Sequence, residues 1–169
     1  IIISANRASK TFFRLLALLI ICSLLFTVPV TPLPIEQTIS RRQSIRSYTS
    51  ENITSQQLLQ ILWAAYGYSS PGYRTTPSIS GSYPLIIYPV NATGSYRYFP
   101  ENHSVALHRS DVNKETIRPH DQNWPSDASV VLVIVWNQTT MGNPYFAWAE
   151  AGCLVQNVYL EANALDLGT

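Results

Sequence analysis

Two arginines and a serine alternate in the segment RRQSIRSY, Arg41–Tyr48. In an extended backbone, side chains at alternate positions project to one side, so Arg42, Ser44 and Arg46 would share a side and Ile45 would face the core. Guanidinium groups form charge-assisted hydrogen bonds with phosphate oxygens, and a hydroxyl adds a further contact. The segment therefore predicts a phosphate site. A solvated or lipid-headgroup patch is the alternative, because the arginines follow an apolar run.

A second segment that could contact a ligand lies before the apolar stretch 85–90. It consists of Pro77, Ser78, Ile79, Ser80 and Gly81. Small residues allow backbone N–H groups to approach a ligand closely. Taken alone, this composition is equally typical of an ordinary turn.

Two helices are expected to position these segments. Thr54 and Gln57 have the spacing of a capping box, and the apolar periodicity after them predicts an amphipathic helix that ends near Gly67. Residues 145–167 predict a helix that is apolar on most of its circumference. Such a helix is normally buried in a domain or at a subunit interface.

The strands are expected from three apolar stretches. Residues 85–90 and 130–136 predict buried strands, and residues 96–99 predict the second strand of a hairpin. Residues 100–125 are polar and predict a long loop with one helical turn. Because strands and helices mix without strict alternation, the fold class is α+β.

The first 35 residues carry three basic side chains and no acidic one, and residues 15–35 carry no charge. An apolar helix of about 20 residues spans a bilayer, and basic flanks stay in the cytoplasm. Residues 1–35 are therefore predicted to form a cytoplasmic flank and a signal anchor, with residues 36–169 as an extracytoplasmic domain. A cleaved signal peptide is the alternative. Four glycosylation sequons agree with export, at Asn52, Asn91, Asn102 and Asn137.

Composition excludes two broad classes. With 46% hydrophobic residues, 12% charged residues and a net charge of +1, the chain is neither disordered nor a strongly basic nucleic-acid binder. The spacing of its three histidines, His103, His108 and His120, makes a zinc site improbable. The chain begins with Ile and stops directly after a helical pattern, which predicts a fragment open at both ends.

In this order, the segments resemble the flavin-dependent nitroreductase family, and within it the SagB-type dehydrogenase branch, which includes azoline-forming oxidases. The matching stretches are RRQSIRSY, LLQILWAAYGYSS, RTTPSISGSYPLIIYPV, SYRYFPENHSVAL, ASVVLVIVW and YFAWAEAGCLVQNVYLEANALDLG. They cover nearly all of residues 37–168. The resemblance implies an α+β homodimer with a mixed central sheet and FMN at the subunit interface.

The resemblance also assigns roles to residues. It implies that Arg42, Ser44 and Arg46 hold the FMN phosphate and ribityl chain, and that the loop Pro77, Ser78, Ile79 and Ser80 lies beside the isoalloxazine ring. The helix around Gln156 and Asn157 would be the central interface helix. The family domain continues beyond Gly168, so the C-terminal part of the flavin site is expected to be absent from this fragment.

The expected function is that of an FMN-dependent oxidoreductase that passes hydride through flavin N5 between a reductant such as NAD(P)H and an unidentified small-molecule or peptide acceptor. No side-chain nucleophile is required, and no catalytic residue is assigned. Two alternatives remain open at this point. One is an azoline oxidase of the same fold that acts on a peptide, and the other is a flavin-binding accessory module without turnover.

Overall fold

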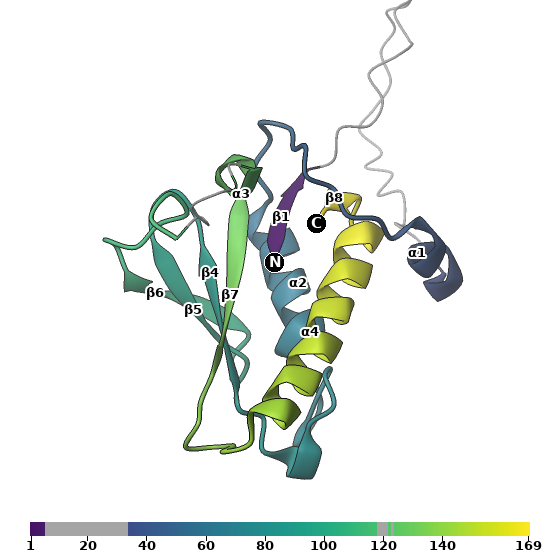
Figure 1. The fold of residues 1–169 in the computed structure, drawn as a ribbon. Coiled ribbons are helices and arrows are strands. Elements are labelled where there is room, and N and C mark those ends of the chain that lie inside the picture. Colours follow the sequence, from purple (N-terminus) through teal and green to yellow (C-terminus); the bar gives the residue numbers. More distant parts are fainter. Residues whose placement is uncertain (6–33, 118–121, 123) are drawn as a thin grey trace, which may run out of the picture.

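A computed structural model describes residues 1–5, 34–117, 122 and 124–169, which form one main sheet with helices against it (Figure 1). In chain order the elements are β1 (Ile2–Ala5), α1 (Ile35–Arg41), α2 (Ser55–Tyr66), β2 (Tyr68–Ser70), β3 (Tyr73–Arg74), the 3₁₀ turn η1 (Ile79–Gly81), β4 (Leu85–Val90), β5 (Ser95–Phe99), β6 (Ser104–Arg109), α3 (Trp124–Asp127), β7 (Val130–Trp136), α4 (Pro144–Ala164) and β8 (Leu167–Gly168). The expected α+β class is confirmed.

The main sheet has six described strands in the order β6-β5-β4-β7-β1-β8. Every neighbouring pair among them is antiparallel, where a mixed sheet was expected. The reason is the place of β1, which inserts between β7 and β8. The strands β7 and β8, which α4 connects, run parallel to each other. Because β1 lies between them and is antiparallel to both, they do not form a parallel pair.

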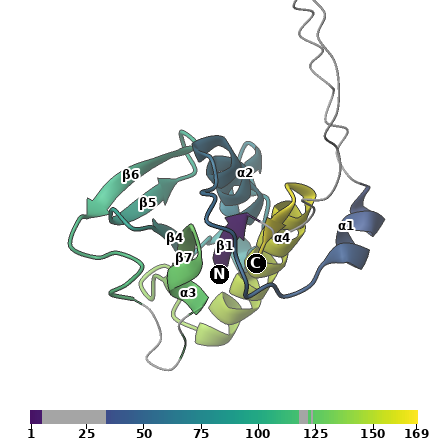
Figure 2. The same cartoon turned by 90° about the horizontal axis from the view of Figure 1, so that it is seen from above.

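The core lies between this sheet and the helices α2 and α4, which cover the same face of it, as the view from above shows (Figure 2). The cluster contains Ile61, Leu62, Ala65, Tyr66, Leu85, Ile87, Tyr98, Val130, Leu132, Ala147, Leu154, Val158 and Ala162. Burial of each large apolar side chain contributes about 1.5–3 kcal/mol. The site segments are therefore attached to a rigid two-layer body.

The predicted helix after Thr54 is confirmed. The Thr54 hydroxyl accepts a hydrogen bond from the Gln57 N–H at 3.1 Å, and the Gln57 carboxamide oxygen accepts one from the Thr54 N–H at 2.9 Å. Two N–H groups that the first turn cannot pair internally are thus satisfied. The helix ends at Gly67, where a Cβ atom would lie 2.5 Å from the Trp63 side chain.

The strand β7 was predicted to be buried, and its two faces are buried to different degrees. Val130 and Leu132 are buried against the helices, whereas Val135 on the opposite face is 40% exposed. A continuous apolar run cannot be distinguished from an alternating one by hydrophobicity alone, because both faces carry valine and isoleucine.

The stretch 100–125 was predicted as a loop, and this is wrong for Ser104–Arg109. These residues form β6, an edge strand that pairs with β5 in the register Arg97↔Ala106 and Tyr98↔Val105. Most of its side chains are exposed, so the alternating hydrophobic signal of a half-buried strand is weak there. A short helix, α3, overlaps the predicted stretch at Trp124 and Pro125.

The first residues were assigned to a flank, and the structure places β1 inside the sheet instead. Ile2 lies opposite Val131 in β7, and Ser4 lies opposite Gly168 in β8. The backbone of β1 pairs with the edge of β7 that β4 leaves open, and this pairing satisfies hydrogen-bonding groups of β7. The predicted anchor lies almost wholly in residues 6–33, outside the described residues. Among the helices that are described, none has the length and apolarity needed to cross a bilayer.

Candidate functional site

The segment after α1 shows part of the predicted alternation. Arg42 has an extended backbone, with φ −58° and ψ 121°. Arg42, Ser44 and Arg46 are exposed, and Ile45 between them is half-buried. Gln43 is also exposed, although alternation would turn it inward. The three predicted phosphate residues therefore face solvent around one apolar anchor.

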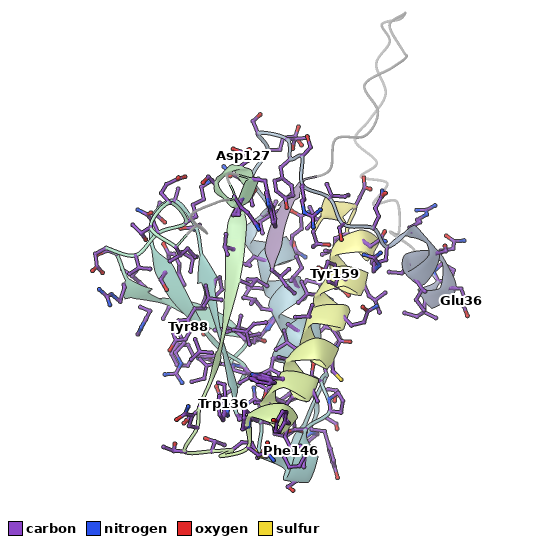
Figure 3. All side chains as sticks on the ribbon, in the orientation of Figure 1. Glu36, Tyr88, Asp127, Trp136, Phe146 and Tyr159 are labelled. Atoms are coloured by element: carbon purple, nitrogen blue, oxygen red, sulfur yellow. The ribbon has the colours of Figure 1, made fainter. Side chains whose placement is uncertain are left out.

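Each of the two arginines lies over an aromatic ring of a different element. The Arg42 guanidinium carbon is 5.7 Å from the ring centre of Tyr159, on the upper half of α4 (Figure 3). The Arg46 guanidinium carbon is 5.5 Å from the Trp124 ring in α3. Within the described part of the chain, neither arginine has a carboxylate at salt-bridge distance. Both positive charges are available to an anion.

A polar hollow of about 530 Å³ lies beside Arg42. Its lining includes Arg41, Arg42, Asn163 and Asp166, but not Ser44 or Arg46. Arg41, which is not among the predicted phosphate residues, also lines this hollow. The Asp166 carboxylate offsets one positive charge in the hollow. Binding of an anion there would therefore require the charges of both Arg41 and Arg42.

The loop Pro77–Ser80 has a sharply turned backbone. Ser80 has φ 61° and ψ 14°, in the left-handed region that costs a non-glycine residue roughly 1 kcal/mol. The Ser78 hydroxyl oxygen accepts a hydrogen bond from the Tyr83 N–H at 3.0 Å and closes the turn. Pro77, Ile79 and Ser80 are exposed. Strained loops of this kind are concentrated at ligand sites.

One chain does not bring the two predicted segments together. The segment after α1 crosses the upper end of α4, and the teal loop that contains Pro77–Ser80 lies at its lower end (Figure 1). Arg42 lies over Tyr159, whereas Thr76, directly before Pro77, contacts Asn157, and positions two apart in a helix face different sides. The seven predicted site residues therefore form two separate groups within a single copy.

The long helix α4 has a buried face and an uncovered face. Ala147, Glu150, Leu154, Val158 and Ala162 are buried in the core. Trp148, by contrast, is 64% exposed. It belongs to the uncovered face with Tyr145, Ala149, Gly152, Cys153 and Gln156. The low amphipathicity of the sequence concealed this division, because both faces are apolar.

The amide of Asn157 has partners within its own chain. Its Nδ2 donates to the Ala64 carbonyl at 3.1 Å and to the Thr75 carbonyl at 3.2 Å. Asn157 therefore ties α4 to α2 and to the loop before Pro77. Gln156 remains exposed.

Comparison with known proteins identifies the family. The family model described as Nitroreductase family matches residues 39–169. The curated protein MJ1384 of Methanocaldococcus jannaschii, which is provisionally named a nitroreductase, is 34% identical over 156 residues that cover 83% of this chain and 78% of that protein. This chain belongs to the nitroreductase family.

Solved structures agree with the nitroreductase fold. A provisionally named nitroreductase from Ralstonia eutropha JMP134 matches with a TM-score of 0.72 and 30% identity, over 82% of this chain and 69% of that one. A provisionally named nitroreductase from Desulfovibrio desulfuricans, solved in complex with FMN, matches with a TM-score of 0.55 and 22% identity, over 82% of this chain and 67% of that one. The second likeness supports the fold alone.

This nitroreductase-family domain also contains a buried polar cluster that the sequence reading missed. Glu150 is only 5% exposed and accepts a hydrogen bond from the Tyr66 hydroxyl. The Tyr66 oxygen accepts a second bond from the Leu85 N–H at 3.2 Å. Burial, and then the bond to Glu150, raise the pKa of Tyr66 well above its usual range. The missed signal was the spacing of Glu150 from Leu154 and Val158, which puts it on the buried stripe.

Proposed function

We propose that this chain forms the flavin-binding body of an FMN-dependent oxidoreductase that acts as a homodimer. Membership of the nitroreductase family over residues 39–169 is the observation that carries the proposal. When bound, FMN would supply two-electron chemistry, with hydride entering and leaving at N5. The chain itself would bind and orient the cofactor.

The residues present fit such a cofactor. Arg42 and Arg46 are exposed guanidinium groups without carboxylate partners among the described residues, which suits a phosphate dianion. Ser44 lies between them as a further donor. The strained loop Pro77–Ser80 would lie against the flat ring system, where Ser80 and its neighbours allow close backbone approach.

The separation of these two groups supports a dimeric site. A twofold axis across the uncovered face of α4 would pair two antiparallel copies of the helix. The upper end of one copy, with Arg42, would then lie beside the lower end of the partner subunit's helix and its ring-binding loop. The small exposed residues Ala149 and Gly152 would allow the two helices to approach closely.

NAD(P)H is the reductant that we propose for the turnover, with a small molecule as acceptor. The SagB-type branch, indicated by the sequence stretches, predicts instead an azoline-containing peptide that is oxidised with oxygen as the final acceptor. A flavin-binding module without turnover is the third possibility. Flavin reduction by NAD(P)H, peptide-dependent oxygen consumption, and flavin binding without either activity distinguish the three.

Titration of flavin-free protein with FMN tests the proposal. Binding should quench FMN fluorescence saturably, and NAD(P)H should then bleach the flavin absorption anaerobically. The titration should use the full-length protein, so that every residue that could contribute to the flavin site is present. Absence of saturable binding by that protein would refute the proposed cofactor.

We also propose an extracytoplasmic location for the domain, on the basis of the basic flank, the uncharged residues 15–35 and the sequons. A single crossing would put residues 1–5 and the domain on opposite sides of the membrane. The pairing of β1 with β7 requires both on the same side. A single crossing and the pairing of β1 with β7 exclude each other. A disulfide cross-link between β1 and β7 would distinguish them.

A further inference from the structure

A small cavity of about 200 Å³ lies where the end of α2 meets the start of β4 and the end of β5. It shares no lining residue with the hollow beside Arg42 or with the groove between α1, α2 and α4. Apolar and aromatic walls are formed by Tyr66, Tyr83, Pro84, Tyr98, Phe99 and Pro100. Its volume is many times the roughly 10–15 Å³ that a single buried water needs, which is enough for one small organic molecule.

The guanidinium of Arg74 lines this cavity inside a cage of three tyrosine rings. Its central carbon is 4.5 Å from the ring centre of Tyr66, 5.1 Å from that of Tyr68 and 5.2 Å from that of Tyr83. The rings hold the planar cation in one orientation and keep most water away from it. Only 12% of the Arg74 side chain is exposed. A cation held in this way interacts more strongly with an anion than a free surface arginine does.

Most hydrogen-bond donors of Arg74 are unused. Nη1 donates to the Tyr66 carbonyl oxygen at 3.1 Å. Among the residues that the structure describes, the buried Nε has no hydrogen-bond partner, and Nη2 has only a carboxylate oxygen of Glu101 at 3.9 Å, too far for a hydrogen bond. A guanidinium has five N–H donors, and buried donors of this strength are normally satisfied.

A second free donor belongs to Tyr83. Its hydroxyl oxygen accepts a hydrogen bond from the Arg74 backbone N–H at 3.2 Å. In the described part of the chain its own O–H proton has no acceptor, so it can be donated to a ligand. Arg74, with its free guanidinium donors, and Tyr83, with its free hydroxyl donor, therefore line the same cavity.

The charges at the cavity define the kind of anion. Arg74 and Arg97 contribute two positive charges, and Glu101 at the rim contributes one negative charge through a side chain that is 64% exposed. One positive charge is thus left over, which a monoanion balances and a phosphate dianion exceeds. Glu101 already brings a carboxylate near Nη2 without forming a hydrogen bond, which leaves that position open to a better-placed carboxylate.

We propose that this cavity binds a small organic monocarboxylate with a flat apolar body, recognised by Arg74 and Tyr83, while the Glu101 side chain moves away from Nη2 but stays at the rim. The carboxylate would accept hydrogen bonds from Nη2 and the Tyr83 hydroxyl, and the body would lie against the aromatic walls. The inference goes beyond the proposed redox function and does not depend on flavin.

Calorimetric titration of the purified chain with sodium benzoate, at constant ionic strength, tests the proposal. For a ligand of this size we expect saturable binding with a dissociation constant of roughly 0.1–10 mM. Benzamide, which has the same shape without the charge, should bind at least about tenfold more weakly. Inorganic phosphate should not displace benzoate at equal concentration.

Substitutions separate recognition from folding. Glu101→Gln removes the competing carboxylate from an exposed position and should tighten benzoate binding about threefold or more. Tyr83→Phe should weaken it about threefold, and Arg74→Lys, which keeps the charge and loses the fork, about tenfold. The matched controls Glu115→Gln and Arg109→Gln alter exposed charges outside the cavity and should leave the affinity unchanged.

Several outcomes would overturn the proposal. These are absence of saturable heat up to about 50 mM benzoate, equal affinity for benzamide, displacement by phosphate, or an affinity that none of the three cavity substitutions changes. Folding of Arg74→Lys is checked by circular dichroism, and the other two variants decide the result if it unfolds. The titration is run with and without FMN, so failure of flavin binding leaves this test intact.

Discussion

Individual side chains decide which charges of this chain are free and which are held by partners. Arg109 forms an exposed, two-point pair with Asp111, and its guanidinium is thereby occupied. The guanidinium groups of Arg42 and Arg46 lie over aromatic rings, and among the described residues neither has a carboxylate at salt-bridge distance, so their charges remain available. This difference gives a direct test of the predicted phosphate site, with an arginine of each kind in the same molecule.

Substitution of Arg42 or Arg46 by alanine should weaken FMN binding. Each charge-assisted hydrogen bond to phosphate is worth about 1.5–3 kcal/mol, or a loss of roughly ten- to hundredfold in affinity. Fluorescence titration of the flavin-free parent protein measures this. Arg109→Ala is the matched control, because Arg41 lies in the hollow and is unsuitable. Unchanged affinity in both site variants would refute the assignment.

The buried pair of Tyr66 and Glu150 should stabilise the fold. Tyr66→Phe removes the donor to Glu150 and the acceptor of the Leu85 N–H, and leaves both buried groups unpaired. We expect the free energy of unfolding to fall by about 1–3 kcal/mol, measured by urea denaturation. Tyr73→Phe, at a residue that is 67% exposed, should have almost no effect. Equal stability of the two variants would contradict the importance of the pair.

Stability should decline at alkaline pH because buried tyrosines keep their protons in the fold. Burial raises the pKa of Tyr98 from 10.0 to about 12. Above pH 10 the unfolded chain loses this proton first, so the free energy of unfolding falls with rising pH, by up to about 1.4 kcal/mol per pH unit. Below pH 10 the contribution is fully present. Between about pH 10 and pH 12, the free energy of unfolding of Tyr98→Phe should fall less steeply with pH than that of the unmodified chain. Equal slopes would show that Tyr98 does not cause the decline.

At the scale of elements, α4 is the central structural feature because one of its faces is buried in the core and the other is exposed. One face closes the core, and Val158 on it is fully buried. The other face has no covering element in the described chain, although it carries Tyr145 and Trp148. A charge at Val158 would therefore unfold the domain instead of testing an interface, so the exposed face must be targeted.

Ala149→Glu should separate the proposed dimer and release flavin with the partner. A carboxylate at this exposed position would be buried without a counter-ion between two antiparallel helices, which is strongly unfavourable. Multi-angle light scattering of the FMN-loaded parent protein measures the change. Ala106→Glu on the exposed edge strand β6 is the matched control and should stay dimeric. A flavin-loaded monomer would contradict the interface.

At the scale of the whole molecule, the first strand closes the sheet beside the last one. β1 lies between β7 and β8, so the two ends of the described chain meet at the same side of the domain (Figure 1). The Leu132 N–H donates to the Ile1 carbonyl oxygen at 2.5 Å, which makes the next pair, Ile2 and Val131, a pair without ladder hydrogen bonds. Such pairs have the shorter Cα separation, within the range that a disulfide can bridge.

The variant Ile2→Cys with Val131→Cys should form a disulfide under mild oxidation. Cys22 and Cys153 are replaced by serine in this background, and Ile2→Cys with Val135→Cys, out of register, is the control. Cross-linking in intact membranes would place residue 2 on the same side as the domain and rule out a single crossing. Failure to cross-link, together with an active extracellular reporter fused after Val90, would refute the pairing of β1 and support the anchor.

The sequence by itself determined the elements whose causes are local. The capping box at Thr54 and Gln57 and the apolar periodicity after it predicted α2, and apolar runs predicted β4 and β7, because these signals act within one or two turns or along one strand. The family resemblance also follows from the sequence, and the family match supports it over residues 39–169. The assignment of Arg42, Ser44, Arg46 and Pro77–Ser80 to a flavin stays a prediction.

Only the tertiary structure decided which apolar faces are covered and which polar groups meet. Glu150 and Tyr66 are 84 residues apart, and no local pattern joins them. Trp148 and Val158 look alike in a helix that is apolar all round, and only the position of α2 and the sheet exposes one and buries the other. The edge strand β6 and the inserted β1 were missed for the same reason. Burial and strand pairing depend on residues distant in the chain, which sequence periodicity does not contain.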